Sequence, residues 1–85
     1  MFEVELSQRA DKFLQKLPLQ ISNRIISRLK KLGETPFPKD AKFIGRDDGK
    51  IFRYRIGDYR ALYMVIEERN IVLVIKIDKR PRVYS

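Results

Sequence analysis

The stretch that decides the fold is residues 51–66, which read IFRYRIGDYRALYMVI. Apolar and charged side chains alternate in its first six residues, and successive side chains of a strand point to opposite faces of a sheet. We therefore predict a strand that presents Arg53 and Arg55 on one face. The other face would bury three side chains: Phe52, Tyr54 and Ile56.

A tight turn at Gly57-Asp58 divides this stretch into two strands. Glycine tolerates the positive φ that two-residue hairpin loops require, so residues 59–66 are predicted to return antiparallel. The hairpin brings Arg60 back beside Arg53 and Arg55. Because three guanidinium groups repel one another, their grouping predicts a site for an anion. The alternative interpretation is a solvated basic edge of the sheet.

Composition narrows the chemistry of such a site. The chain has 85 residues, with 19 Lys and Arg against 11 Asp and Glu, and a net charge of +8. This excess favours a polyanionic partner, either a nucleic acid or an acidic protein. Neither cysteine nor histidine occurs, which excludes disulfides and thiol catalysis and argues against a zinc site. No stretch approaches the roughly 20 apolar residues of a membrane span, so no membrane partner is expected.

Residues 1–33 have the pattern of one strand followed by two helices. After an alternating strand at the N-terminus, Ser7 is suited to cap a helix over residues 8–17, where apolar side chains recur at helical spacing. Pro18 cannot continue this helix but can open a second one, which ends near Gly33. The outer side of the second helix carries three cations: Arg24, Arg28 and Lys31. We favour a solvated helix exterior for them, and a phosphate-tracking surface is the alternative.

Residues 34–50 are rich in proline, glycine and aspartate, which predicts a loop. Within it, residues 41–44 fit either a short strand or an anchored extended piece. Asp47 and Asp48 could suggest metal ligands, but turn chemistry explains the pair better because no carboxylate cluster lies nearby. Two aromatic side chains are interpreted as loop anchors: Phe37 and Phe43.

The last predicted strand, residues 71–77, is almost wholly apolar, which is typical of a strand in mid-sheet or covered on both faces. Lys76 interrupts it, and the basic residues 79–85 that follow are either a flexible tail or part of the site. The elements predict one α+β domain over residues 1–85. It has an N-terminal strand, a two-helix hairpin and an antiparallel meander of three to four strands, in two layers.

These features resemble the RelE/ParE superfamily of toxins from type II toxin–antitoxin pairs. The resemblance rests on FRYRIGDYRALYMV in the central hairpin, VLVIKI in the last strand and KRPRVY near the end. It implies a RelE-like microbial RNase-type fold and the mRNA interferase branch of the superfamily. Such toxins enter the ribosomal A site and cut mRNA there through the substrate's 2′-hydroxyl, with neither metal nor cofactor. The resemblance also implies a cytoplasmic protein that a cognate acidic antitoxin holds in a hetero-oligomer.

The resemblance assigns catalytic roles to five residues: Arg53, Arg55, Arg60, Arg80 and Tyr84. Arg82 is a rival of Arg80, because the tail is shorter than in some members. Further RNA contacts are expected from six basic residues: Arg82, Lys79, Lys42, Arg24, Arg28 and Lys31. Some RelE-like enzymes have lysines at the positions of Arg53 and Arg55. Many related toxins have a histidine where this chain has Lys79.

The four tyrosines are expected to play different roles. Tyr84 is expected to stack on a base or relay a proton, and packing of the tail onto the sheet is its structural alternative. The other three are expected in the core or on a sheet face: Tyr54, Tyr59 and Tyr63.

Three functions compete at this point. A ribosome-dependent endoribonuclease is favoured, because the arginines and Tyr84 occur together. A ParE-type toxin that inhibits DNA gyrase and cuts nothing is the alternative. A non-catalytic RNA-binding module is the third, although no stacking platform is evident in the sequence.

Overall fold

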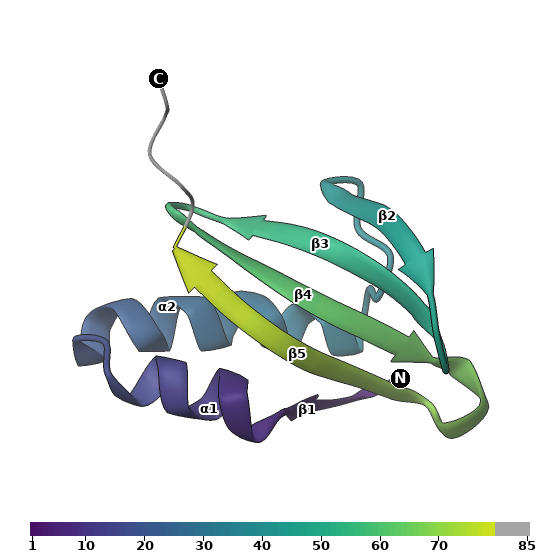
Figure 1. Cartoon of the computed structure of the whole chain (residues 1–85), viewed down its shortest axis with the longest axis horizontal. Coiled ribbons are helices and arrows are strands. Elements are labelled where there is room, and N and C mark those ends of the chain that lie inside the picture. The colour runs from purple at the N-terminus through teal and green to yellow at the C-terminus, as the bar shows by residue number, and fades with distance from the viewer. Residues whose placement is uncertain (80–85) are drawn as a thin grey trace.

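Five strands and two helices are arranged in two layers (Figure 1). The computed structural model describes residues 1–79. The elements are β1 (Glu3–Leu6), α1 (Gln8–Gln15), α2 (Leu19–Lys30), β2 (Ala41–Arg46), β3 (Lys50–Ile56), β4 (Tyr59–Ile66) and β5 (Ile71–Lys79). Short 3-10 turns follow α2 at Lys31–Gly33 and β4 at Glu67–Arg69. The predicted α+β class and element order are confirmed.

The sheet has the strand order β1-β5-β4-β3-β2. Strands β2 to β5 form the predicted antiparallel meander, and residues 41–44 belong to a strand. The sheet has five strands instead of three to four, because β1 also joins it, parallel to β5. Strand β5 therefore lies in mid-sheet, one of the two positions that its apolar sequence predicts.

The helix boundaries follow from capping. The Ser7 hydroxyl accepts a hydrogen bond from the backbone N–H of Ala10 at 3.0 Å and donates to the carbonyl of Ile75 at 2.7 Å. Helix α1 ends at Gln15, two residues before the predicted end, because its last turn tightens: the Leu17 N–H bonds to the carbonyl of Leu14. Helix α2 begins directly after Pro18, as predicted.

The helices cover one face of the sheet and form the core with it. Buried side chains of both layers make one cluster, which includes Ile25 and Leu29 of α2 and Val72 and Val74 of β5. Tyr63 is fully buried, and its hydroxyl donates to the carbonyl of Pro36 at 2.7 Å. Burial raises the pKa of Tyr63 far above its ordinary value, so this tyrosine stays protonated.

Four more aromatic side chains of the described residues were assigned positions from the sequence: Tyr54, Tyr59, Phe37 and Phe43. Tyr54 is buried and Tyr59 is partly buried against the core, as expected of core or sheet-face residues. Phe37 and Phe43 flank the ring of Phe52 at centroid distances of 5.4 Å and 5.6 Å. Phe43 belongs to β2, so its interpretation as a loop residue is wrong.

The opposite side of the sheet is called the distal face, because it is turned away from the helices. Along β3 the buried Phe52, Tyr54 and Ile56 face the helices, so Arg53 and Arg55 lie on the distal face, as predicted. The same alternation along β4 places Arg60 and Leu62 there.

Candidate functional site

The β3–β4 hairpin brings the three predicted arginines together. Gly57, with φ of 58°, forms the turn with Asp58, and Ile56 pairs with Tyr59 on its other side. Glycine at the first turn position of a two-residue loop is the pattern expected when φ must be positive there. The register then sets Arg55 directly opposite Arg60, while Arg53 lies opposite Leu62.

A hollow of about 270 Å³ lies between these side chains on the distal face. It is lined by four cations and one carboxylate: Lys42, Arg53, Arg55, Arg60 and Asp40. Strand β2 contributes Lys42, which pairs in register with Arg53. Like charges directly opposite one another weaken a sheet. The hollow therefore has the charge and the donor groups of an anion site.

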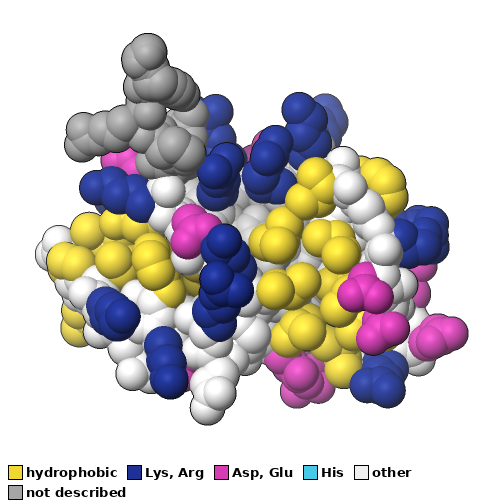
Figure 2. All heavy atoms as spheres, in the orientation of Figure 1, with side chains coloured by type: hydrophobic (Ala, Val, Ile, Leu, Met, Phe, Trp, Pro, Cys, Tyr) yellow, Lys and Arg dark blue, Asp and Glu magenta, His cyan; other side chains and the backbone are white. Residues whose placement is uncertain are grey.

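A second hollow of about 160 Å³ continues the first toward β5. Arg53 and Arg60 line both hollows, and Lys76 and Asp78 complete the second. The two hollows together are called the basic trough. In Figure 2 a group of Lys and Arg side chains occupies the upper part of the molecule, next to a broad apolar area.

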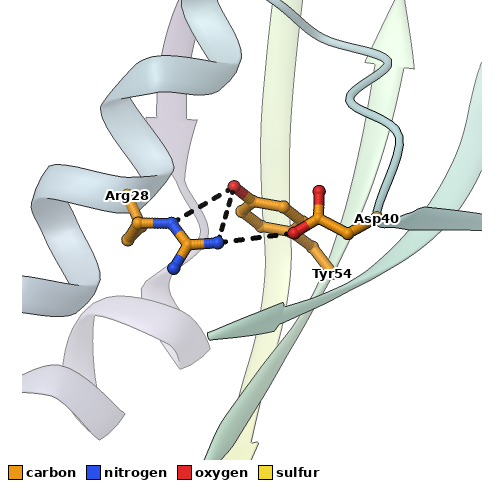
Figure 3. Close-up of polar contacts among 3 residues, drawn as sticks. All are labelled: Arg28, Asp40 and Tyr54. Atoms are coloured by element: carbon orange, nitrogen blue, oxygen red, sulfur yellow. Dashed lines mark hydrogen bonds and ion pairs between the residues drawn. The ribbon is translucent and has the colours of Figure 1, made fainter. Parts of the chain in front are cut away.

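One end of the basic trough is tied to helix α2 through Arg28 (Figure 3). The Arg28 guanidinium donates to the Tyr54 hydroxyl from Nε at 3.3 Å and from Nη2 at 3.1 Å. Nη2 also lies 3.5 Å from Oδ2 of Asp40, and the guanidinium carbon lies 5.2 Å from the centroid of the Tyr54 ring. Arg28 thus bridges the helix, the sheet and the loop before β2.

Three other predicted RNA contacts lie apart from the basic trough: Arg24 of α2, Lys31 of the turn after it and Lys79 of β5. Arg24 and Lys79 line a separate hollow of about 280 Å³ beside the β3–β4 turn. Lys31 is exposed in the 3-10 turn after α2. Three predicted site residues lie outside the described residues: Arg80, Arg82 and Tyr84.

Three residues of the basic trough were missed by the sequence analysis: Asp40, Lys76 and Asp78. Asp40 precedes β2 by one residue, and its position follows only from the pairing of Ala41 with Tyr54. Lys76 and Asp78 are charged residues two positions apart in a largely apolar strand. This pattern was the signal in the sequence that both side chains point to the same solvent-exposed face of the sheet.

Two further features concern the described residues 1–79: clusters of metal-ligating side chains and membrane-spanning helices. No group of three or more Asp, Glu, His or Cys side chains in this range is placed to hold a metal ion. Asp47 and Asp48 lie in the bend between β2 and β3, as predicted from turn chemistry. No helix in the same range has the length and apolar character to cross a membrane.

Comparison with known proteins gives a consistent result. The family described as the ParE toxin of the type II toxin–antitoxin system parDE matches residues 4–84. The mRNA interferase toxin RelE of Escherichia coli K12 is 32% identical over 84 residues, which cover 96% of this chain and 88% of RelE.

Solved structures agree in fold. The archaeal RelE–RelB complex of Pyrococcus horikoshii contains a chain with a TM-score of 0.85 and 26% identity, covering 96% of this chain and 98% of that one. Isolated RelE of Escherichia coli gives a TM-score of 0.82 and 26% identity, covering 98% of this chain and 88% of that one.

Proposed function

The chain belongs to the ParE toxin family of type II toxin–antitoxin systems, within the RelE/ParE superfamily, and we propose that it is an mRNA interferase toxin. One observation carries the proposal: β3 and β4 bring Arg53, Arg55 and Arg60 into one hollow. The similarity to RelE of Escherichia coli, which is named as an mRNA interferase toxin, supports the same function.

The proposed reaction uses the 2′-hydroxyl of the substrate as nucleophile. Its oxygen forms a bond to the adjacent phosphorus, and the bond from phosphorus to the 5′-oxygen of the next nucleotide breaks, leaving a cyclic phosphate. The 2′-hydroxyl loses its proton and the 5′-oxygen gains one. Because the nucleophile is part of the substrate, the reaction requires no metal ion and no cofactor.

The arginines fit the charge that this reaction creates. Attack on phosphorus adds negative charge to the phosphoryl oxygens, and preorganised guanidinium groups stabilise it and can bind two oxygens at once. Arg60, which lines both hollows of the basic trough, is assigned by resemblance to the scissile phosphate. Arg53 and Arg55 are assigned to orienting the RNA backbone and to lowering the effective pKa of the attacking hydroxyl.

The tail completes the proposed site. By resemblance, Arg80, with Arg82 as its rival, would share the scissile phosphate with Arg60. Tyr84 would stack on a base or relay a proton. These assignments rest on the motif KRPRVY alone.

We further propose that cleavage occurs in the ribosomal A site, in the cytoplasm. The test is primer extension on an mRNA translated in vitro with and without the protein. Discrete cuts at ribosome-positioned codons are expected, and none when the same mRNA is free of ribosomes. Equal cutting of free mRNA would refute ribosome dependence but not the nuclease.

Inhibition of DNA gyrase is the second candidate, because the matching family is described by its ParE toxins. It predicts intact mRNA and inhibited supercoiling in the presence of the protein. The convergent arginines favour the nuclease, since binding to a protein target does not require three guanidinium groups around one hollow.

The proposed partner is an acidic antitoxin, by analogy with the toxin–antitoxin complex of Pyrococcus horikoshii. Its carboxylates would meet the cations of the basic trough. The distal face also carries Ile51, Leu62 and Leu73, which an amphipathic helix of the antitoxin could cover. The expected product is a hetero-oligomer in which the toxin is inactive.

A further inference from the structure

A β-bulge in β5 decides what the second hollow of the basic trough contains. Tyr63 pairs with Val74 and Leu62 pairs with Lys76, so Ile75 is an extra residue without a partner on β4. Before the bulge Val72 and Val74 face the helices, and after it Ile77 does. An inserted residue reverses the alternation of side chains. Without it Lys76 and Asp78 would point into the core.

The bulge is held in place from the other layer of the molecule. The hydroxyl of Ser7, which caps α1, donates to the carbonyl of Ile75 at 2.7 Å. The Ser7 hydroxyl thus satisfies the carbonyl of Ile75, a backbone acceptor that a strand would pair in a regular ladder. Bulges are common beside functional sites, where they redirect a side chain.

Lys76 extends the line of cations across the sheet. Lys42 pairs with Arg53, Arg53 with Leu62 and Leu62 with Lys76, so these residues form one row over β2, β3, β4 and β5. Three interstrand steps separate its ends, which is about 14 Å at the usual strand spacing. A row of this length exceeds what one phosphate group can contact.

Lys76 forms a weak ion pair with Asp78. Its ammonium lies 3.1 Å from Oδ2 of Asp78, and both side chains are roughly half exposed. Exposed ion pairs contribute little, so an anion with more acceptor oxygens can replace the carboxylate. Asp78 in turn lines the second hollow and lies opposite Arg60, which lines both hollows.

We propose that the second hollow is a binding subsite for a second phosphate of the same RNA strand. In it Lys76 binds the phosphate next to the one at Arg60, and Asp78 holds the ammonium until that phosphate arrives. This inference rests on the proposed function, because it takes RNA as the ligand. It adds a binding residue, Lys76, and a residue that tunes it, Asp78.

The test compares two uncleavable ligands that differ by one phosphate. A 2′-O-methyl dinucleotide without terminal phosphates contains one phosphate, and the matching trinucleotide contains two. Binding of each is measured by NMR titration for the parent protein, Lys76→Gln and Lys12→Gln. Lys12 is exposed on α1, in the other layer, so its substitution changes the net charge equally at a distance.

Lys76→Gln is expected to weaken binding of the trinucleotide about three- to tenfold and to leave the affinity for the dinucleotide unchanged. Lys12→Gln should change neither. With a longer 2′-O-methyl strand, the dependence of log affinity on log salt should flatten by about 0.7, the value for one lost phosphate contact on a single strand. Asp78→Asn should raise the affinity for the trinucleotide, and this gain in affinity should vanish in a protein that already carries Lys76→Gln.

The outcomes separate this inference from the proposed function. If Lys76→Gln binds both ligands like the parent, or loses both equally, the second subsite is wrong while Arg60 and the nuclease stand. Weakened antitoxin binding with unchanged RNA binding would likewise overturn it and assign Lys76 to the protein interface. A parent that binds the trinucleotide but leaves translated mRNA intact would refute the nuclease alone. A parent that binds neither ligand would overturn the second subsite, and primer extension on translated mRNA would then decide separately on the nuclease.

Discussion

Replacing Arg60 by glutamine should lower the cleavage rate strongly and make the protein more stable. Arg60 shares its two hollows with Lys42, Arg53, Arg55 and Lys76, against two carboxylates. In the free protein, removing this charge therefore removes more repulsion than attraction.

The size of each effect follows from the geometry. The directly opposed pair of Arg55 and Arg60 suggests a gain of about 0.2–1 kcal/mol in the free energy of unfolding, and the loss of the opposite-charge pair between Arg60 and Asp78 offsets part of this gain. For a domain of this size, a gain of about 0.2–1 kcal/mol raises Tm by about 1–8 °C, and the offset from Asp78 places the expected rise in the lower part of this range. The lost guanidinium should lower the cleavage rate by about 10²–10³, as for other single donors to a developing oxyanion.

The two effects are measured separately. Tm is followed by circular dichroism at low and high salt, and cleavage by primer extension in a translation extract. The stabilisation should shrink at high salt, because salt screens exposed charges. Arg69→Gln is the matched control, since Arg69 is exposed in the 3-10 turn after β4 and should affect neither quantity. A folded Arg60→Gln protein that cuts at the parental rate would refute the assignment of Arg60.

Three further predictions concern the tail, the core and the antitoxin. If Tyr84 relays a proton, Tyr84→Phe should be as defective in mRNA cleavage as Tyr84→Ala, whereas a stacking role predicts that Phe retains most activity; full activity of Ala would exclude both roles. Tyr63→Phe should lower the free energy of unfolding by about 0.5–1.5 kcal/mol, measured by urea titration, because it removes the bond to Pro36 while leaving cleavage unchanged. Since burial raises the pKa of Tyr63, the unfolded state loses this proton first, so the parent should lose stability as pH rises above about 10 and the variant should lose less. Association with the antitoxin encoded beside this gene, measured by stopped flow, should slow steeply with added salt; an on-rate indifferent to salt would show that charge does not guide the encounter.

Local patterns in the sequence were sufficient for one half of the site. Alternation along β3 and the glycine at position 57 specify a hairpin, and a hairpin fixes which residues face each other. The juxtaposition of Arg53, Arg55 and Arg60 could therefore be predicted from 16 consecutive residues, and the structure confirms it. The parallel pairing of β1 with β5 could not, because it joins residues about 68 positions apart.

The other half of the site depends on contacts that no local pattern contains. Lys76 reaches the basic trough only through the bulge at Ile75, and the partner of that bulge, Ser7, is 68 residues away in sequence. Arg28 was interpreted either as solvated or as a phosphate contact. Its hydrogen bond to Tyr54 and its ion pair with Asp40 give it a third role, as a link between α2 and the end of the trough.

The repulsion within the basic trough connects the proposed substrate with the proposed inhibitor. Any polyanion that fills the trough relieves it, so RNA and an acidic antitoxin should both stabilise the folded domain by binding to it. Because both would use the same cations, they should exclude each other, and the antitoxin would inhibit by competition as well as by covering the apolar side chains of the distal face. Substitutions that neutralise the trough cations should therefore raise Tm and weaken the binding of both RNA and antitoxin. The trough cations are thus expected to be retained for binding and catalysis at the expense of the stability of the free protein.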